Sequence, residues 1–117
     1  MSTQRMMVVE LKMGSISVSG EAPASHAGLD AGAGAACLQA FEAFRKKLTP
    51  QARTRSHTRG DMLQAEAYTT SPQGRVQMCK LELAPLTKRI NGTADMYLGR
   101  QVAATVSTTM YKVAKLL

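Results

Sequence analysis

Two short segments near the start of the chain alternate apolar and polar residues, and this pattern limits the fold more than any other feature. Residues 7–13 have apolar side chains at the odd positions, with Glu10 and Lys12 between them, and residues 16–20 alternate in the same way. A period of two is typical of a strand with one buried and one solvated face. Such a sheet needs a second layer of structure to cover its apolar face.

The connection between these segments has two interpretations. A two-residue turn at Met13-Gly14 would place Leu11 opposite Ile16 and align the apolar faces of the two segments in a hairpin. Methionine is not a favoured turn residue, so one continuous, bent strand stays open as the alternative. The second segment is a strand in both interpretations.

A first helix is predicted over residues 35–48, because apolar side chains recur there at three- and four-residue spacing. The glycine-rich residues 28–34 before it are either the start of this helix, with glycines that permit close packing, or a phosphate-binding loop. They lack the lysine and hydroxyl residue of a P-loop. Thr49-Pro50 is expected to end the helix, because proline disfavours helical geometry in the residue before it.

Two further strands are expected in the middle of the chain. Residues 62–70 alternate clearly, with Leu63 on the apolar face, and residues 71–74 have the composition of a turn. Residues 75–84 alternate less regularly, which indicates either a bulge or burial on both faces. Residues 87–90 are a candidate for one more short strand.

A second helix is predicted over residues 93–117, where Thr93 suits the N-cap and Asp95 the first turn. The β-branched residues within 102–109 lower the helix propensity, so a strand stays open there as the alternative. The helix is favoured by one apolar stripe, which consists of Leu98, Val102, Val106, Met110, Val113 and Leu117.

The predicted order of elements is β(β)-α-β-β-(β)-α, where parentheses mark strands that the sequence leaves open. This order predicts an α+β fold in which two helices pack on one face of a mainly antiparallel sheet. A chain of 117 residues has room for one domain, so residues 1–117 are assigned to a single domain. Residues 1–14 are either an added strand or an N-terminal extension.

No sequence motif indicates catalysis, and we expect a protein that is not an enzyme and uses no metal or cofactor. Cys37 and Cys79 are too few and too far apart for a disulfide framework or a cysteine zinc site, and their apolar neighbours favour buried thiols. His26 and His57 lie in polar, loop-like segments, and no neighbouring carboxylate orients His57 as a general base. The Glu10, Glu66 and Glu82 carboxylates are expected to face solvent.

The expected cellular location rests on two sequence features that we do not find, a membrane span and a signal peptide. No apolar run approaches the roughly 18 residues of a membrane span, and the first residues do not follow the pattern of a signal peptide. We therefore expect no membrane partner and a location in the cytoplasm or an organellar matrix.

Positive charge is concentrated along the chain, which has 15 Lys and Arg against 8 Asp and Glu. No acid lies between residues 43 and 60, where arginines alternate with hydroxyl residues, a composition that suits phosphate contacts. A second basic group flanks the last helix, and both groups border one surface if the helices lie side by side. The predicted nucleic-acid-binding residues are Arg45, Lys46, Lys47, Arg53, Arg55, His57, Arg59, Lys88, Arg89, Arg100, Lys112 and Lys115.

This charge predicts a non-catalytic protein that binds RNA or the ribosome through phosphate contacts. Aromatic residues make up only 4% of the chain, which disfavours recognition by base stacking. The alternative is a structural or assembly subunit of a larger complex, such as a virion or an organellar particle. Such a subunit would use a sheet edge and a methionine-rich surface for protein contacts. Self-association into a homo-oligomer stays open.

Three features resemble one known family. Residues 16–20 form an alternating strand that ends in glycine, Asp95-Met96-Tyr97 opens the last helix, and the segments 79–83 and 87–90 precede that tripeptide at a similar spacing. In these features the chain resembles the ribosome hibernation promoting factors, the family that includes ribosome-associated inhibitor A. The resemblance covers about residues 15 to 117. It implies a β-α-β-β-β-α fold that binds the small ribosomal subunit in the mRNA and tRNA channel and silences translation without chemistry.

Overall fold

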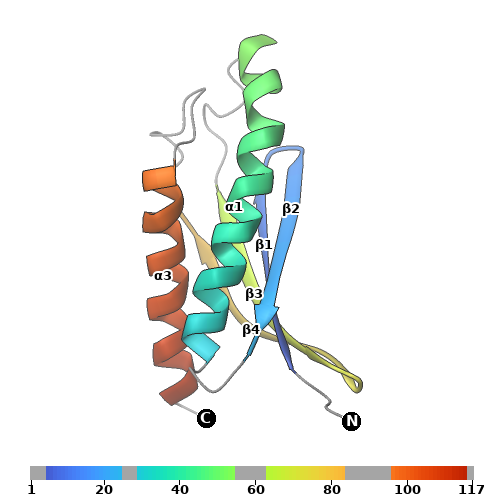
Figure 1. The fold of residues 1–117 in the computed structure, drawn as a ribbon, viewed down its shortest axis with the longest axis vertical. Coiled ribbons are helices and arrows are strands. Elements are labelled where there is room, and N and C mark those ends of the chain that lie inside the picture. Colours follow the sequence, from blue (N-terminus) through green and yellow to red (C-terminus); the bar gives the residue numbers. More distant parts are fainter. Residues whose placement is uncertain (1–4, 25–28, 55–62, 84–95, 116–117) are drawn as a thin grey trace.

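The computed structural model describes residues 5–24, 29–54, 63–83 and 96–115. The strands form one sheet in the order β2-β1-β3-β4, and each neighbouring pair is antiparallel. Both helices cover the same face of this sheet (Figure 1), which confirms the predicted α+β fold. In chain order, the elements are β1 (Met6–Met13), β2 (Ile16–Pro23), α1 (Leu29–Thr54), β3 (Gln64–Ser71), β4 (Gly74–Glu82) and α3 (Met96–Lys115).

The strands β1 and β2 form a hairpin, and the alternative of one continuous strand is wrong. Met13 pairs with Ile16, so the turn is Gly14-Ser15 and lies one residue later than predicted. Gly14 has a φ of 58°, a conformation that glycine adopts without the steric cost of a side chain. β1 lies between β2 and β3 in the sheet, so this part of the N-terminal segment is an interior strand.

The irregular pattern of the fourth strand comes from a β-bulge, one of its two predicted causes. Ala67 pairs with Cys79 while Tyr68 pairs with Gln77, so Met78 is the extra residue on β4. The apolar face predicted for β3 is confirmed, because Leu63, Ala65 and Ala67 are buried. The strand suggested at residues 87–90 lies outside the described residues.

The helix α1 is longer at both ends than its apolar spacing predicts. Residues 29–34 are helical, which favours the helix-start interpretation of the glycine-rich segment, and Gly28 lies outside the described residues. The predicted end at Thr49-Pro50 is wrong, because the helix continues to Thr54. Proline removes one backbone hydrogen bond from a helix, but its own fixed φ is helical.

The helix α3 continues through the β-branched segment, so the strand alternative is wrong. The hydroxyl groups of Thr105 and Thr109 donate to the carbonyl oxygens of Gln101 and Thr105, at 3.0 Å and 2.9 Å. Thr side chains are accommodated in a helix by such bonds to the preceding turn. Within the predicted stripe, Val102, Val106 and Met110 are buried. Thr93 and Asp95, predicted at the start of this helix, lie outside the described residues.

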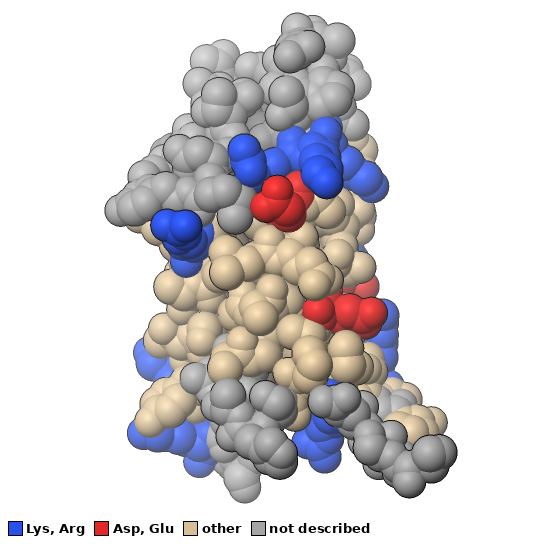
Figure 2. Space-filling model, in the orientation of Figure 1, with Lys and Arg blue, Asp and Glu red and all other residues tan. Residues whose placement is uncertain are grey.

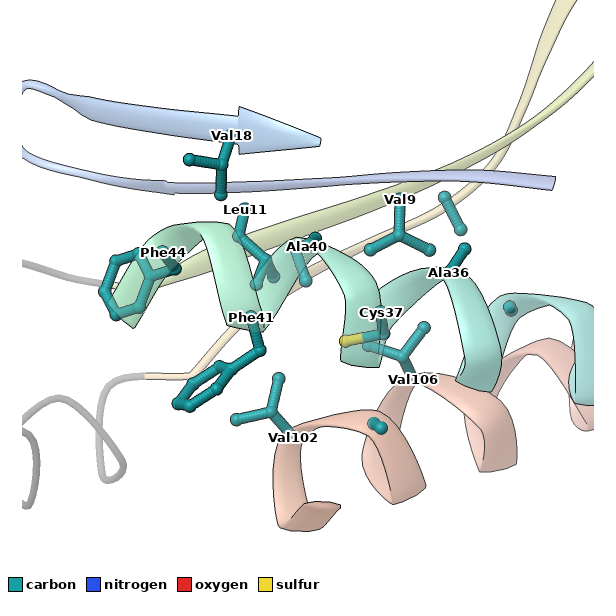
Figure 3. Packing of buried hydrophobic residues seen from close by; sticks show 14 of the residues in the cluster. Val9, Leu11, Val18, Ala36, Cys37, Ala40, Phe41, Phe44, Val102 and Val106 are labelled. Atoms are coloured by element: carbon teal, nitrogen blue, oxygen red, sulfur yellow. The ribbon is translucent and has the colours of Figure 1, made fainter. Parts of the chain in front are cut away.

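The core lies between the sheet and the two antiparallel helices. Figure 3 shows α1 in the middle of it, with the side chains of Ala36 and Ala40 toward the strands and Phe41 and Cys37 toward α3. Two glycines permit this close packing. A Cβ atom on Gly20 would lie 2.3 Å from the carbonyl oxygen of Ala36, and one on Gly99 would lie 2.6 Å from the Phe41 ring. α1 therefore approaches β2 at Gly20, and α3 approaches α1 at Gly99, because glycine has no side chain.

Candidate nucleic-acid interface

Charge is divided unequally between the helices and the strands. The helices contain seven cations and two acids: Arg45, Lys46, Lys47, Arg53, Arg100, Lys112 and Lys115, with Asp30 and Glu42. The strands contain three cations and four acids: Lys12, Arg75 and Lys80, with Glu10, Glu21, Glu66 and Glu82. The positive charge of the molecule thus belongs to the helical layer and to the segments between the elements.

The antiparallel helices bring two predicted basic groups together at one end. Gly99 contacts Phe41, so Arg100 at the start of α3 lies beside the part of α1 that carries Arg45. Figure 2 shows the helical side of the molecule, with Lys and Arg side chains gathered over the upper part of α1 and the first turns of α3. We call this group the basic end; it consists of Arg45, Lys46, Lys47 and Arg100.

Two cations of the basic end have protein partners. Arg45 lies 3.7 Å from Glu42 on the same exposed helix surface, and Lys47 donates from its Nζ to the carbonyl oxygen of Ser17 at 3.3 Å. An exposed ion pair of this kind is worth at most about 1 kcal/mol, so a phosphate can replace it at little cost. Lys46 and Arg100 are exposed and form no ion pair with any residue that the structure describes.

Lys112 and Lys115 lie at the other end of α3. The rise of an α-helix, about 1.5 Å per residue, places Lys112 about 18 Å from Arg100 along the helix axis. The expectation that both basic groups border one surface rested on the helices lying side by side, as they do in Figure 1. Because the helices are antiparallel, however, Lys112 and Lys115 are separated from Arg45, Lys46 and Lys47 by most of the length of α3.

For the remaining predicted binding residues, the structure does not describe where the side chain lies. Arg53 belongs to the last turn of α1, but the direction of its side chain is not described. The others lie outside the described residues: Arg55, His57, Arg59, Lys88 and Arg89.

The open face of the sheet carries a polar network that the sequence did not predict. Glu66 accepts hydrogen bonds from the hydroxyl of Tyr68 and, at 2.8 Å, from Nε2 of Gln77. Lys12 lies 4.0 Å from both Glu66 and Glu10. The alternating pattern placed Glu10 and Glu66 toward solvent, but only the strand register makes them direct cross-strand neighbours.

Arg75 extends this network across the sheet. It lies 3.4 Å from Glu10, and its guanidinium is 5.1 Å from the centre of the Tyr68 ring. The hydrogen bond with Tyr68 is the main cause that lowers the pKa of Glu66, and the same bond raises the pKa of Tyr68. The strand cations Lys12 and Arg75 are therefore engaged by neighbouring acids, unlike Lys46 and Arg100.

Burial raises the pKa of both cysteine thiols, which disfavours the reactive thiolate form. Cys37 is buried, as predicted, and this burial raises its pKa to about 12. Cys79 is only half-buried, and burial raises its pKa as well. His26 and His57 lie outside the described residues. Within the described part of the chain, no group of three His, Cys, Asp or Glu side chains is placed to hold a metal ion.

The outer edge of β2 is partly covered by side chains from α1. The backbone N–H of Glu21 donates to Oε1 of Gln39 at 2.9 Å, and Lys47 reaches the carbonyl oxygen of Ser17. An open strand edge is a template for a strand from another molecule. These contacts occupy groups that an added strand would need, which weighs against assembly through this edge.

Comparison with known proteins gives no relative for this chain: no family model, no curated protein and no solved structure matches it. Among the described residues, no helix is long and apolar enough to cross a membrane. Fold and charge together define a small α+β protein with a cationic helical layer on one side and a charge-paired sheet face on the other.

Proposed function

We propose that this protein binds RNA without catalysing a reaction and that the basic end holds the phosphate backbone. The observation that carries the proposal is the collection of Arg45, Lys46, Lys47 and Arg100 at the junction of the two helices, with Glu42 as the one acid described among them. Arginine binds phosphate oxygens in a bidentate manner, and lysine adds an unspecific positive charge. Phosphate contacts of this kind position a protein on nucleic acid without reading its sequence.

The proposed target is the ribosome. The basis is the resemblance of Asp95-Met96-Tyr97 to the hibernation promoting factors, and α3 begins at Met96. Bound in the mRNA and tRNA channel of the small subunit, a protein of this size would block translation by occupancy alone. This proposal requires only affinity for structured RNA and no catalytic group.

The proposal is tested by filter binding of the protein to purified ribosomes and to a structured RNA across a range of salt concentrations. Replacing Arg45 and Lys46 with glutamine should weaken binding about tenfold and reduce the slope of log K against log salt by about 2. The matched control, Lys12→Gln with Lys80→Gln, removes the same charge from the sheet face and should leave the slope nearly unchanged. Salt-independent binding, or no binding, would contradict the proposal.

A further inference from the structure

The outward-facing side of α3 has cations at both ends and no acid along its length. We call it the α3 outer face; its exposed residues are Arg100, Ala104, Thr105, Thr108, Tyr111, Lys112 and Lys115. Arg100 lies at one end and the two lysines at the other. In Figure 2 the side of the molecule occupied by α3 shows basic groups above and below an uncharged middle.

The middle of this face is shallow and made of small side chains. Ala104, Thr105, Thr108, Thr109 and Lys112 line an open hollow of about 340 Å³. The hydroxyls of Thr105 and Thr109 donate to carbonyl oxygens of their own helix. Thr108 forms no hydrogen bond with any described residue, so its hydroxyl is available to a ligand.

The spacing of the charges is compatible with contacts to two phosphate backbones across one groove. Arg100 and Lys112 are about 18 Å apart along the axis, which is comparable to a nucleic-acid groove together with the strands that border it. α3 runs beside α1 (Figure 1) and is in close contact with it at Gly99 and at Gly34, so only its outer face is open to a ligand. The minor groove of A-form RNA is wide and shallow and displays the 2′-hydroxyl groups of both strands.

We infer that the α3 outer face docks across the minor groove of an A-form RNA duplex. Arg100 contacts the phosphates of one strand, Lys112 and Lys115 contact those of the other, and Thr108 lies against the 2′-hydroxyl groups between them. This inference rests on the proposed RNA-binding function and narrows its target to double-helical segments. Recognition is by shape and backbone, so it does not depend on base sequence.

The test measures fluorescence anisotropy with a labelled RNA duplex of about 20 base pairs, the DNA duplex of the same sequence, and one RNA strand alone. Thr108→Glu places a negative charge in the middle of the face and should weaken duplex RNA binding at least tenfold. Thr108→Gln adds similar bulk without charge and should change affinity less than threefold. Thr70→Glu makes the same substitution on the open sheet face, where its strand partner is Arg75, and should have little effect. Circular dichroism verifies that each variant is folded.

The inference is supported if the wild-type protein prefers the RNA duplex to both other ligands and only Thr108→Glu weakens this binding. It is overturned if the DNA duplex or the single strand binds as tightly, or if Thr108→Glu binds duplex RNA like the wild type. If Thr108→Glu has no effect while loss of Arg45 and Lys46 abolishes binding, the α3 outer face is excluded and the proposed function stands. If no RNA binds in a salt-dependent way, both fail.

Discussion

The two outer surfaces of this protein differ in how many of their charged side chains are paired with opposite charges. On the open sheet face, Lys12 and Arg75 lie within 4.0 Å of Glu10, and Glu66 is held by Tyr68 and Gln77. On the helical side, Lys46 and Arg100 form no ion pair with any described residue. The sheet face therefore pairs its cations with acids, whereas the helical layer has cations that no described acid neutralises.

This difference shows why net charge alone does not locate a binding surface. A phosphate that approaches the sheet face must displace Glu10 from Arg75 and must approach Glu66 as well, so repulsion offsets the attraction. At the basic end, the phosphate meets one acid, Glu42, in an exposed pair that is easily exchanged. A phosphate-binding surface is thus better located by the number of cations without a neighbouring carboxylate than by net charge.

The largest effect is expected from a substitution that disrupts the packing of the helical layer on the sheet. Gly20→Val should destabilise the protein by about 3 kcal/mol or more, because its Cβ would lie 2.3 Å from the carbonyl oxygen of Ala36 and 2.6 Å from the amide nitrogen of Ala40. Urea unfolding followed by circular dichroism measures the change.

The control is a glycine at the contact between α1 and α3. A Cβ on Gly34 would lie 3.5 Å from the side chain of Ser107, an ordinary contact, and this glycine is inside a helix. Gly34→Ala should be neutral or stabilise the fold by up to about 1 kcal/mol. If Gly20→Val unfolds at the same urea concentration as the wild type, α1 does not pack on β2 as described.

The second test compares the two surfaces directly at constant net charge. One variant replaces Arg100, Lys112 and Lys115 with glutamine, and the other replaces Lys12, Arg75 and Lys80. The helix variant should lose affinity for structured RNA and reduce the salt slope by about 3, whereas the strand variant should change the slope by less than 1. Equal loss from both variants would show that total charge, not the helical layer, determines binding.

Most of the fold could be predicted from local patterns because the apolar residues of each element recur on one face, at the spacing of a strand or of a helix. Alternation located β1, β2 and β3, and apolar spacing located both helices. The turn was misplaced by one residue because the side-chain pattern is compatible with two registers, although a glycine at the first turn position was an available signal. Pro50 was given too much weight, because proline weakens a helix locally and does not always end it.

The candidate site was less predictable, since it depends on which distant residues become neighbours. The cations were visible in the sequence, but the antiparallel direction of α3 decides that Arg100 joins the basic end and that Lys112 does not. The contact of Arg75 with Glu10 requires the register of β1 with β3 and of β3 with β4. Neither the direction of a helix nor that register is encoded by local periodicity.

The third test weakens the network on the sheet face. Tyr68→Phe removes the hydrogen bond to Glu66 and should cost about 1 kcal/mol of unfolding free energy at neutral pH. The control is Tyr111→Phe, because Tyr111 is half exposed and its hydroxyl forms no hydrogen bond with a described residue. RNA affinity should not change in Tyr68→Phe; a loss of affinity would place RNA on the sheet face.

The pH dependence of stability distinguishes this network from simple packing. The pKa of Glu66 is lowered in the fold, so its contribution is complete above its ordinary value of 4.5 and is lost as the pH falls through the lowered pKa. The pKa of Tyr68 is raised, so its contribution is present below 10.0 and is lost as the pH rises through the raised pKa. Tyr68→Phe should therefore flatten the stability profile at both ends.

The smallest effect on stability is expected at the edge of β2, where the helical layer protects the sheet. Gln39→Ala with Lys47→Ala should cost less than about 1 kcal/mol, because both contacts are exposed hydrogen bonds. The backbone groups of Glu21 and Ser17 then become available to a strand of a second copy, and light scattering should show self-association at rising concentration. Gln39→Ala with Lys46→Ala removes the same charge but keeps the Lys47 contact, so it should associate less. If both variants stay monomeric, these contacts do not protect the edge.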